Sequence, residues 1–434
     1  MNDYTVFRQR RERFLQQTGS AVAVLATAPE RPRNRDSHYP YRYDSHFYYL
    51  TGFEEPEAVL VLHAVTGRSI LFCRDKDPER EIWDGFRYGP AAAAELFGFD
   101  EAYSITQLDE RLPGLLADQA VLHYALGADA AWDARVIGWL NTVRGQARSG
   151  TTAPAEVRDV RVAVDAMRLI KDDCEQDLMR RSAAIASAAH RRAMQATRPG
   201  GYEYQVEAEI LHEFRSRGAQ SPAYTSIVAG GPHACVLHYV ENNALLRDGD
   251  LLLIDAGCEL DGYASDITRT FPVNGKFSAV QRDVYETVLS AQAAALEAIR
   301  PGASWQAPHE AAVRILAQGL VDFGLCRGSV EGVIESGDYR RFYMHRTGHW
   351  LGLDVHDVGD YKSGGEWRLL EPGMTLTVEP GCYIRPADDV PEAFWNIGIR
   401  IEDDVLVTAQ DKEIFSASAP KSVADIEALM AARR

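Results

Sequence analysis

Four acidic residues lie in segments that otherwise read as apolar β-strands: Asp255 in LLLID, Asp266 in the strand that follows, Glu379 in TLTVE and Glu402 in IGIRIE. Because an unpaired buried charge is very costly, such carboxylates need metal cations or arginines as partners. Arg400 is the one basic residue that we place beside them on these strands. They could instead be surface acids on edge strands, but four of them beside a histidine-rich loop favour a site for divalent metal ions.

The segment HRTGHWLGLDVHD (345–357) contains three of the chain's 12 histidines. His345 and His349 are spaced as in the HExxH zinc helix, but the glutamate after the first histidine is missing and Gly348 disfavours a helix, so that motif is excluded. A site of four carboxylates and an imidazole is rich in hard oxygen ligands. It suits Mn²⁺ and can accept Co²⁺, Fe²⁺ or Zn²⁺, whereas structural zinc favours thiolates.

The first two aspartates are joined by a predicted β-hairpin. Asp261-Gly262 is a strong signal for a two-residue turn, and pairing across it opposes residues whose numbers add to 523, so Asp266 faces Gly257. Side chains alternate along a strand, which makes Asp255 and Asp266 diagonal neighbours on one face, roughly 7–8 Å apart. Such a pair could bridge two metal ions about 3.5–4 Å apart, although a bulge would change this geometry.

The second half of the sequence contains an internal duplication. A helix, RPGGYEY and a second helix recur 102 residues later as a helix, RPGASWQ and another helix. RDGDLLLIDAGC likewise resembles EPGMTLTVEPGC at an offset of 124, which aligns Asp255 with Glu379. We therefore expect two similar α/β halves, each of which brings an acid on a strand to a shared centre.

The 434 residues exceed what one core usually supports, so two domains are expected. The N-terminal part reads as an α/β unit, with strand-like segments at 21–29, 57–75 and 120–126 and a helix at 129–145. The second of these segments should be a hairpin that turns near Thr66-Gly67. Small and turn-prone residues precede the duplicated half, so we place the domains at 1–170 and 171–434.

Charge and composition limit the classes of partner. The net charge of -17 and the pI near 5.2 disfavour binding to nucleic acid or to an anionic membrane. No apolar run approaches the ~18–20 residues of a membrane span, and the N-terminus lacks the apolar region of a signal peptide. Six cysteines are scattered without a CxxC pair, so we expect a reducing, cytoplasmic location.

Several long segments resemble one known family. They are YTSIVAGGPHACVLHY, DGDLLLIDAGCELDGYASDITRTFPVNGKFS, HRTGHWLGLDVHDVG, LEPGMTLTVEPGCYI and GIRIEDDVLVT, with RDSHYPYRYDSHFYYLTGFEEPEAVLVL in the first domain. In this order they resemble the pita-bread metallopeptidases, specifically the Xaa-Pro aminopeptidases (aminopeptidase P). The resemblance implies a mixed α/β (α+β) fold, in which a small N-terminal α/β domain precedes a pita-bread domain with an internal pseudo-two-fold duplication.

The resemblance also implies a ligand set for two divalent ions, for which Mn²⁺ is the best fit. Asp266 and Glu402 would bridge or flank the pair. Asp255 would complete one site, and His349 and Glu379 would complete the other. Of the histidines in the 345–357 segment, only His349 would then touch metal.

Further residues match the family's substrate pocket and catalytic machinery. His238, His345 and His356 would line the pocket. Glu379 would take the proton of the attacking water and pass it to the leaving proline nitrogen, and His238 or His356 would stabilise the oxyanion together with a metal. Arg400 would orient ligand carboxylates.

Two residues of the first domain match positions that close the family's site, in the same or in a neighbouring subunit: Trp83 in EIWDGFRYG and Asp36 in NRDSHYPYR. Packing at a domain or subunit interface is an equally good interpretation of both. The resemblance further implies a homo-oligomer, either a dimer or a tetramer.

The expected reaction is hydrolysis of the bond between an N-terminal residue and a following proline, by a hydroxide activated at two metal ions. The partners would be peptides with proline at the second position. One alternative is a prolidase, which shares the five ligands but cleaves only dipeptides. A second alternative, in a different class, is a non-catalytic pita-bread binding module or a metal-free creatinase-like enzyme. Both typically lose ligand residues, and all five are present here.

Overall fold

The computed structural model describes residues 4–19 and 21–432 and divides the chain after Arg168 into two compact units, each described by itself below. We expected the domain boundary between residues 170 and 171, which is two residues after the division in the structure. No helix in the described part of the chain is long and apolar enough to cross a membrane.

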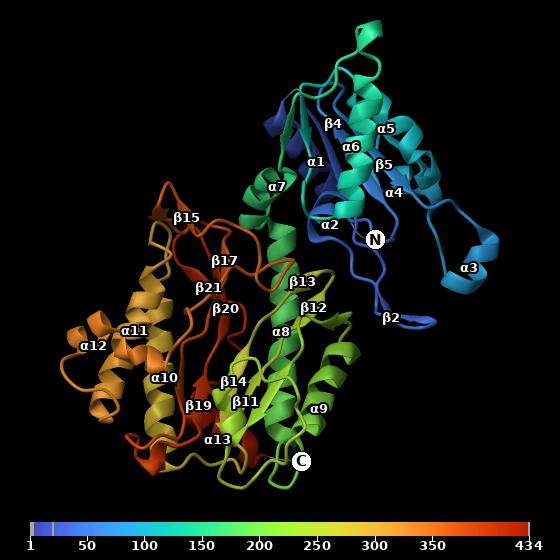
Figure 1. Cartoon of the computed structure of the whole chain (residues 1–434). Helices are drawn as coiled ribbons and strands as arrows, with labels where there is room; N and C mark the ends of the chain where they lie inside the picture. The colour runs from blue at the N-terminus through green and yellow to red at the C-terminus, as the bar shows by residue number, and fades with distance from the viewer. Residues whose placement is uncertain (1–3, 20, 433–434) are drawn as a thin grey trace. The chain divides into compact units, whose positions relative to one another are not determined.

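The first unit is built on a mixed six-stranded sheet with the order β6-β5-β4-β1-β7-β8 (Figure 1). The strands are β1 (Ala21–Ala26), β4 (Val59–His63), β5 (Arg68–Cys73), β6 (Glu101–Ser104), β7 (Val121–His123) and β8 (Glu156–Arg158). A separate ribbon consists of β2 (Pro32–Asn34) and β3 (Ser37–His38). The helices are α1 (Thr5–Thr18), α2 (Ser45–Thr51), α3 (Pro78–Asp84), α4 (Gly89–Phe97), α5 (Leu108–Leu116), α6 (Ala130–Arg144) and α7 (Val160–Leu169).

The local signals in this unit predict its elements well. β4 and β5 form the expected hairpin, and Gly67 adopts a φ of 67° in its turn, a conformation that glycine adopts without steric cost. α6 begins after Asp129, whose side chain accepts hydrogen bonds from the backbone N–H groups of Ala131 and Trp132. Apolar side chains of the sheet and of α5 and α6 share one core.

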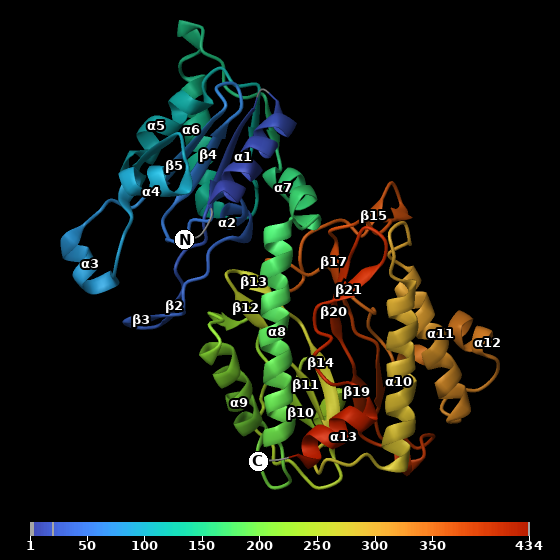
Figure 2. The same cartoon turned by 180° about the vertical axis from the view of Figure 1, so that it is seen from behind.

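The second unit contains two helix pairs with strands between them, as Figures 1 and 2 show from opposite sides. The pairs are α8 (Asp173–Ala196) with α9 (Glu203–Ser216), and α10 (Ala279–Ala298) with α11 (Ala307–Asp322). The remaining helices are α12 (Val330–Ser336) and α13 (Val423–Ala431). The strands are β9 (Ser221–Pro222), β10 (Ile227–Gly230), β11 (Leu251–Asp255), β12 (Cys258–Leu260), β13 (Tyr263–Ala264), β14 (Thr268–Pro272), β15 (Lys362–Ser363), β16 (Glu366–Trp367), β17 (Thr375–Val378), β18 (Gly381–Ile384), β19 (Ile397–Arg400), β20 (Asp403–Val407) and β21 (Lys412–Ile414).

The two halves of this unit share the same helix caps and the same type of hairpin. The first helix of each pair starts with a capping box, formed by Asp172 and Glu175 in α8 and by Ser278 and Gln281 in α10. Each half then forms a long hairpin made of two ladders: an outer ladder away from the connecting turn or loop and an inner ladder next to it. β11 pairs with β14 and β12 with β13 in the first half, while β17 pairs with β20 and β18 with β19 in the second. The structure therefore contains the internal duplication that the sequence predicts.

The first hairpin has the predicted register. Asp255 pairs with Thr268 and Glu259 with Ala264, so opposed residues add to 523 in both ladders. Asp261 and Gly262 adopt φ values of 48° and 85°, which is the conformation of a two-residue type I′ turn.

Candidate metal centre and substrate pocket

The four strand carboxylates occupy equivalent positions in the two hairpins. Asp255 and Glu379 lie where the outer ladder gives way to the inner one on the first strand of each hairpin. Asp266 and Glu402 lie at the same break on the returning strand. Because ladder hydrogen bonding is interrupted at these breaks, each hairpin can turn two carboxylates toward a common centre. The duplication thus supplies four carboxylates from two copies of one local structure.

One tyrosine and one arginine hold the aspartates of the first hairpin. The hydroxyl of Tyr224 lies 2.5 Å from Oδ1 of Asp255 and 2.5 Å from Oδ1 of Asp266. Arg400 donates from Nη2 to Oδ2 of Asp255 at 2.6 Å, and all of these side chains are largely buried. A single hydroxyl reaches both carboxylates, so the two aspartates point into the same space, as the predicted hairpin requires.

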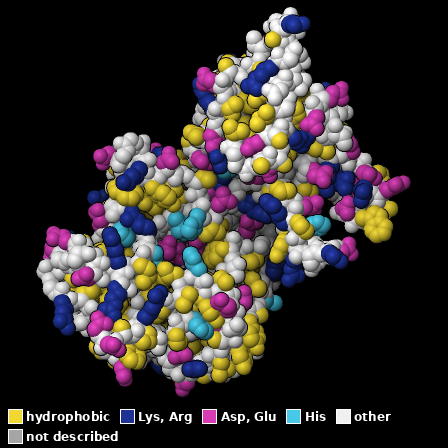
Figure 3. All heavy atoms as spheres, viewed as in Figure 1, with side chains coloured by type: hydrophobic (Ala, Val, Ile, Leu, Met, Phe, Trp, Pro, Cys, Tyr) yellow, Lys and Arg dark blue, Asp and Glu magenta, His cyan; other side chains and the backbone are white. Residues whose placement is uncertain are grey.

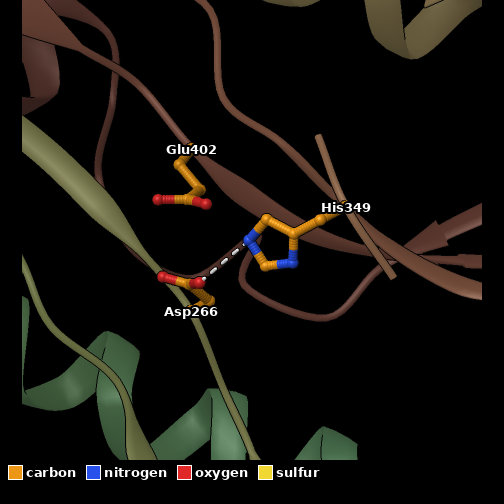
Figure 4. Close-up of side chains that lie close together, drawn as sticks. All are labelled: Asp266, His349 and Glu402. Carbon is orange, nitrogen blue, oxygen red and sulfur yellow. Dashed lines mark ion pairs between the residues drawn. The ribbon is translucent and has the colours of Figure 1, made fainter. Parts of the chain in front are cut away.

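His349 completes a cluster with Asp266 and Glu402, and Figure 4 shows the three side chains pointing toward one another. One ligand atom from each lies within 4.8 Å of the others. His349 Nε2 is 3.4 Å from Asp266 Oδ2 and 3.7 Å from Glu379 Oε1. The other ring nitrogen, Nδ1, lies 2.9 Å from the carbonyl oxygen of Trp350. A proton on Nδ1 would satisfy that carbonyl and leave the Nε2 lone pair free for a metal ion.

The electrostatics of the cluster require additional positive charge. Burial, followed by repulsion from neighbouring carboxylates, raises the pKa of Glu402 well above its usual value and also raises the pKa of Asp266. Burial raises the pKa of Glu379 to about 7. Although burial opposes it, the carboxylates of Asp266 and Glu379 raise the pKa of His349 to about 9. A donor set of two buried and two half-buried carboxylates with one imidazole carries more negative than positive charge, and it fits hard divalent metal ions.

Residues behind the carboxylates fix their orientation. Thr268 donates from its hydroxyl to Glu402 Oε2 at 2.6 Å. Arg400 donates to the Thr268 hydroxyl at 3.1 Å and to the Tyr383 hydroxyl at 2.9 Å. The same Tyr383 hydroxyl lies 2.8 Å from His345 Nε2. This chain of contacts connects a pocket histidine with the arginine that holds Asp255.

Beside these ligands is a cavity of about 1220 Å³, and Figure 3 shows histidine side chains gathered next to acidic ones on this unit. His238, His345 and His356 all line the cavity. Burial, and then the charge of Arg400, lowers the pKa of His345 to about 3. Burial also lowers the pKa of His356 to about 4, and its ring centroid lies 4.0 Å from that of His349. Both low pKa values favour the neutral imidazole near pH 7, a form that can both donate and accept hydrogen bonds in the cavity.

The structure brings nine of the eleven predicted site residues to this one cavity. They are Asp255, Asp266, His349, Glu379, Glu402, His238, His345, His356 and Arg400. The other two lie in the first unit. Asp36 occupies the turn between β2 and β3 with a φ of 66°, and Trp83 lies on α3 with 83% of its surface exposed. Their proposed contribution to the site stays a prediction.

Two tyrosines and one arginine of the site are not indicated by any local sequence pattern. Tyr224 and Tyr383 lie in the segments YTSIV and PGCYI, but no short-range pattern indicates that their hydroxyls meet residues 31 or 17 positions away. Arg269 is a second basic residue on these strands, in addition to the Arg400 that we placed beside the four acids. Its guanidinium donates to Asp403 at 2.7 Å, with both side chains fully buried. Alternation along β14 could have indicated that Arg269 points away from the face that carries Thr268.

Comparison with known proteins gives a consistent result for the whole chain. Residues 177–409 match the model of metallopeptidase family M24, and residues 7–123 match that of the aminopeptidase P N-terminal domain. The Xaa-Pro aminopeptidase of Escherichia coli is 48% identical over 433 residues, which cover 99% of this chain and 98% of that protein. The Haemophilus influenzae Xaa-Pro aminopeptidase is 46% identical over 427 residues, 98% of this chain and 96% of that protein.

Solved structures agree in fold over nearly the full length. Aminopeptidase PepP of Pseudomonas aeruginosa matches with a TM-score of 0.97 and 50% identity, over 99% of this chain and 98% of that one. A zinc-substituted E. coli aminopeptidase P in complex with product matches with a TM-score of 0.97 and 46% identity, over 100% of this chain and 99% of that one.

Proposed function

The chain belongs to metallopeptidase family M24 and carries the aminopeptidase P N-terminal domain, and from this premise we propose that it is a metal-dependent Xaa-Pro aminopeptidase. It would release the N-terminal residue from peptides whose second residue is proline. The observation that carries this function is the convergence of two duplicated hairpins on one cavity, where four carboxylates and His349 lie beside three further histidines. The identity of 46–48% with two curated Xaa-Pro aminopeptidases over nearly the whole chain supports it.

The metal centre would hold two divalent ions, with Mn²⁺ the best fit to the oxygen-rich donor set. Asp266 and Glu402 would be shared between the ions. Asp255 would complete one site, and His349 with Glu379 would complete the other. When bound, the ions would neutralise the carboxylates and lower the pKa of a shared water toward neutrality.

The side chains around this centre have separate roles in the proposal. Glu379 would take a proton from the attacking water and return it to the proline nitrogen that leaves. His238 or His356, which both line the cavity, would donate a hydrogen bond to the oxygen that becomes negative, an interaction worth roughly 3–4 kcal/mol per donor in comparable sites. Arg400 would keep Asp255 oriented through their 2.6 Å contact.

Residues outside this cavity have a place in the proposal as well. Trp83, exposed on α3, and Asp36, exposed in the β2–β3 turn, would contribute to peptide binding in the same or in a neighbouring subunit. Figure 3 shows hydrophobic side chains at the surface of α3, which would suit such a contact. The working form would be a cytoplasmic homo-oligomer, a dimer or a tetramer.

Substrate length separates this function from the prolidase alternative. The protein would be stripped with a chelator and assayed on a tripeptide Xaa-Pro-Yaa and on the dipeptide Xaa-Pro, with and without Mn²⁺. We expect release of the first residue from the tripeptide only when metal is returned. Cleavage of the dipeptide alone would identify a prolidase. Failure to cleave either peptide, with metal bound, would favour a binding module.

A further inference from the structure

We propose that Glu203 is a positioning residue for His238, an inference that rests on the pocket role proposed above for this histidine. Glu203 is the first residue of α9, and its side chain is 0% exposed. His238 lies in the irregular connection between β10 and β11, is exposed, and lines the cavity. An exposed residue outside any helix or strand can hold a fixed position only if its neighbours are anchored.

The Glu203 carboxylate provides that anchor with both of its oxygens. Oε1 accepts from the backbone N–H of Gly230 at 2.8 Å and lies 3.2 Å from His233 Nδ1. Oε2 accepts from the Tyr239 hydroxyl at 2.8 Å and from the backbone N–H of Ala244 at 2.8 Å. His233, Tyr239 and Ala244 belong to the connection that carries His238, and Gly230 is the last residue of β10, where the connection begins. A buried carboxylate is very costly without such partners. The donors therefore stabilise the charge of Glu203, and their hydrogen bonds to it fix the position of the connection.

Tyr239 transmits this constraint to His238. It is the next residue in the chain, it is buried, and its ring stacks on that of His233 with the centroids 4.3 Å apart. Its hydroxyl is fixed by Glu203 and its ring by His233, so the direction of the backbone at this point is set. His238 is the residue before Tyr239, and its side chain therefore enters the cavity at a defined place.

A second anchor in the connection is Asn242, which lies between Tyr239 and Ala244. Asn242 is buried and adopts a φ of 47°, a left-handed conformation that asparagine tolerates well. It accepts from the backbone N–H of Val228 at 2.9 Å and donates to the carbonyl of Ser226 at 2.8 Å. These contacts hold Asn242 against β10, whereas the stretch that includes His238 and Tyr239 is held by the carboxylate.

The test begins with Glu203→Gln, which keeps the size of the side chain but replaces one acceptor with an NH₂ donor that faces existing donors. We expect kcat/KM for a Xaa-Pro-Yaa tripeptide to fall by about 10–100-fold, as when an oriented catalytic group is displaced. Bound Mn²⁺ should stay at the wild-type amount, because the proposed ligands lie on other segments. Glu209→Gln is the matched control on the same helix. Its side chain is 38% exposed and pairs with Arg192, so this variant should keep wild-type kinetics.

A double-mutant cycle with His238→Ala separates positioning from general structural support. If Glu203 acts through His238, then adding Glu203→Gln to the His238→Ala variant should lower its kcat/KM by less than about twofold. Should Glu203→Gln fail to fold, Tyr239→Phe would take its place, because it removes only the hydroxyl that links the two residues. Equal losses in both backgrounds would overturn the inference and leave the proposed function standing. Wild-type activity of His238→Ala would overturn the inference together with the pocket role of this histidine.

Discussion

Replacing Gly257 with alanine should damage the metal centre, because a Cβ at this position would collide with the backbone of the returning arm of the first hairpin. A Cβ at this position would lie 1.6 Å from the backbone carbonyl oxygen of Ser265. Such atoms essentially never approach within 3.0 Å, so the strands would have to separate by at least 1.4 Å. The obstacle is a backbone atom and cannot rotate away.

That separation would act directly on the ligands. Gly257 lies two residues after Asp255, and Ser265 immediately precedes Asp266. Metal sites tolerate ligand displacements of only about 0.2 Å, so a shift several times larger should remove one carboxylate from any shared ion. We expect weaker Mn²⁺ binding and a loss of about 100-fold or more in kcat/KM, with a cost of about 1–3 kcal/mol in the free energy of unfolding.

The assay would measure bound metal after dialysis, tripeptide cleavage and urea unfolding on the same preparation. Gly138→Ala is the matched control, because Gly138 lies inside α6 and a Cβ there would meet nothing within 4 Å. It should keep full activity and gain about 0.5–1 kcal/mol of stability. If Gly257→Ala retained both its metal and a kcat/KM within twofold of the wild type, the hairpin would accommodate a Cβ here without moving the carboxylates, which contradicts the prediction.

Three further predictions concern ligands, buried charge and pH. Asp266→Ala should lose bound metal and turnover while keeping its circular dichroism spectrum; activity without metal would contradict the ligand assignment. Lys171→Met should lower the free energy of unfolding by about 3–5 kcal/mol, because it removes the lysine 2.9 Å from the buried Asp357 carboxylate, and adding Asp357→Leu should restore much of the loss in urea denaturation. Burial lowers the pKa of His190 from 6.5 to about 4, so the unfolded chain binds a proton before the folded protein does, and stability should fall between pH 6.5 and 4. His190→Gln should show a smaller loss over that pH range, and equal losses would refute the assignment.

Local sequence signals predict the first hairpin almost completely. Asp261-Gly262 fixes a type I′ turn, the turn fixes the register, and the register places Asp255 and Asp266 on one face. The offset between the repeats then locates Glu379 by analogy with Asp255. These inferences succeed because each depends on residues that are close in sequence or related by the duplication.

Contacts between distant segments are not predictable in this way. Arg269 pairs with Asp403 across 134 residues, and Arg400 reaches Asp255 across 145. Neither spacing carries a period or a turn signal, so the sequence indicates that the carboxylates need partners without indicating which arginine serves which acid. The neutral state of His345 is likewise a product of burial in the folded structure. Tertiary packing therefore decides the fine electrostatics of the site, whereas local patterns and the duplication predict which strands carry its carboxylates.

The most direct test of the central claim is anomalous diffraction from crystals soaked in Mn²⁺. The duplicated hairpins predict two peaks about 3.5–4 Å apart, both within coordination distance of Asp266 and Glu402. One peak should also contact Asp255, and the other His349 and Glu379. A single peak elsewhere, or none in crystals of active protein, would contradict the proposal that the two halves of the fold meet to build one dinuclear centre.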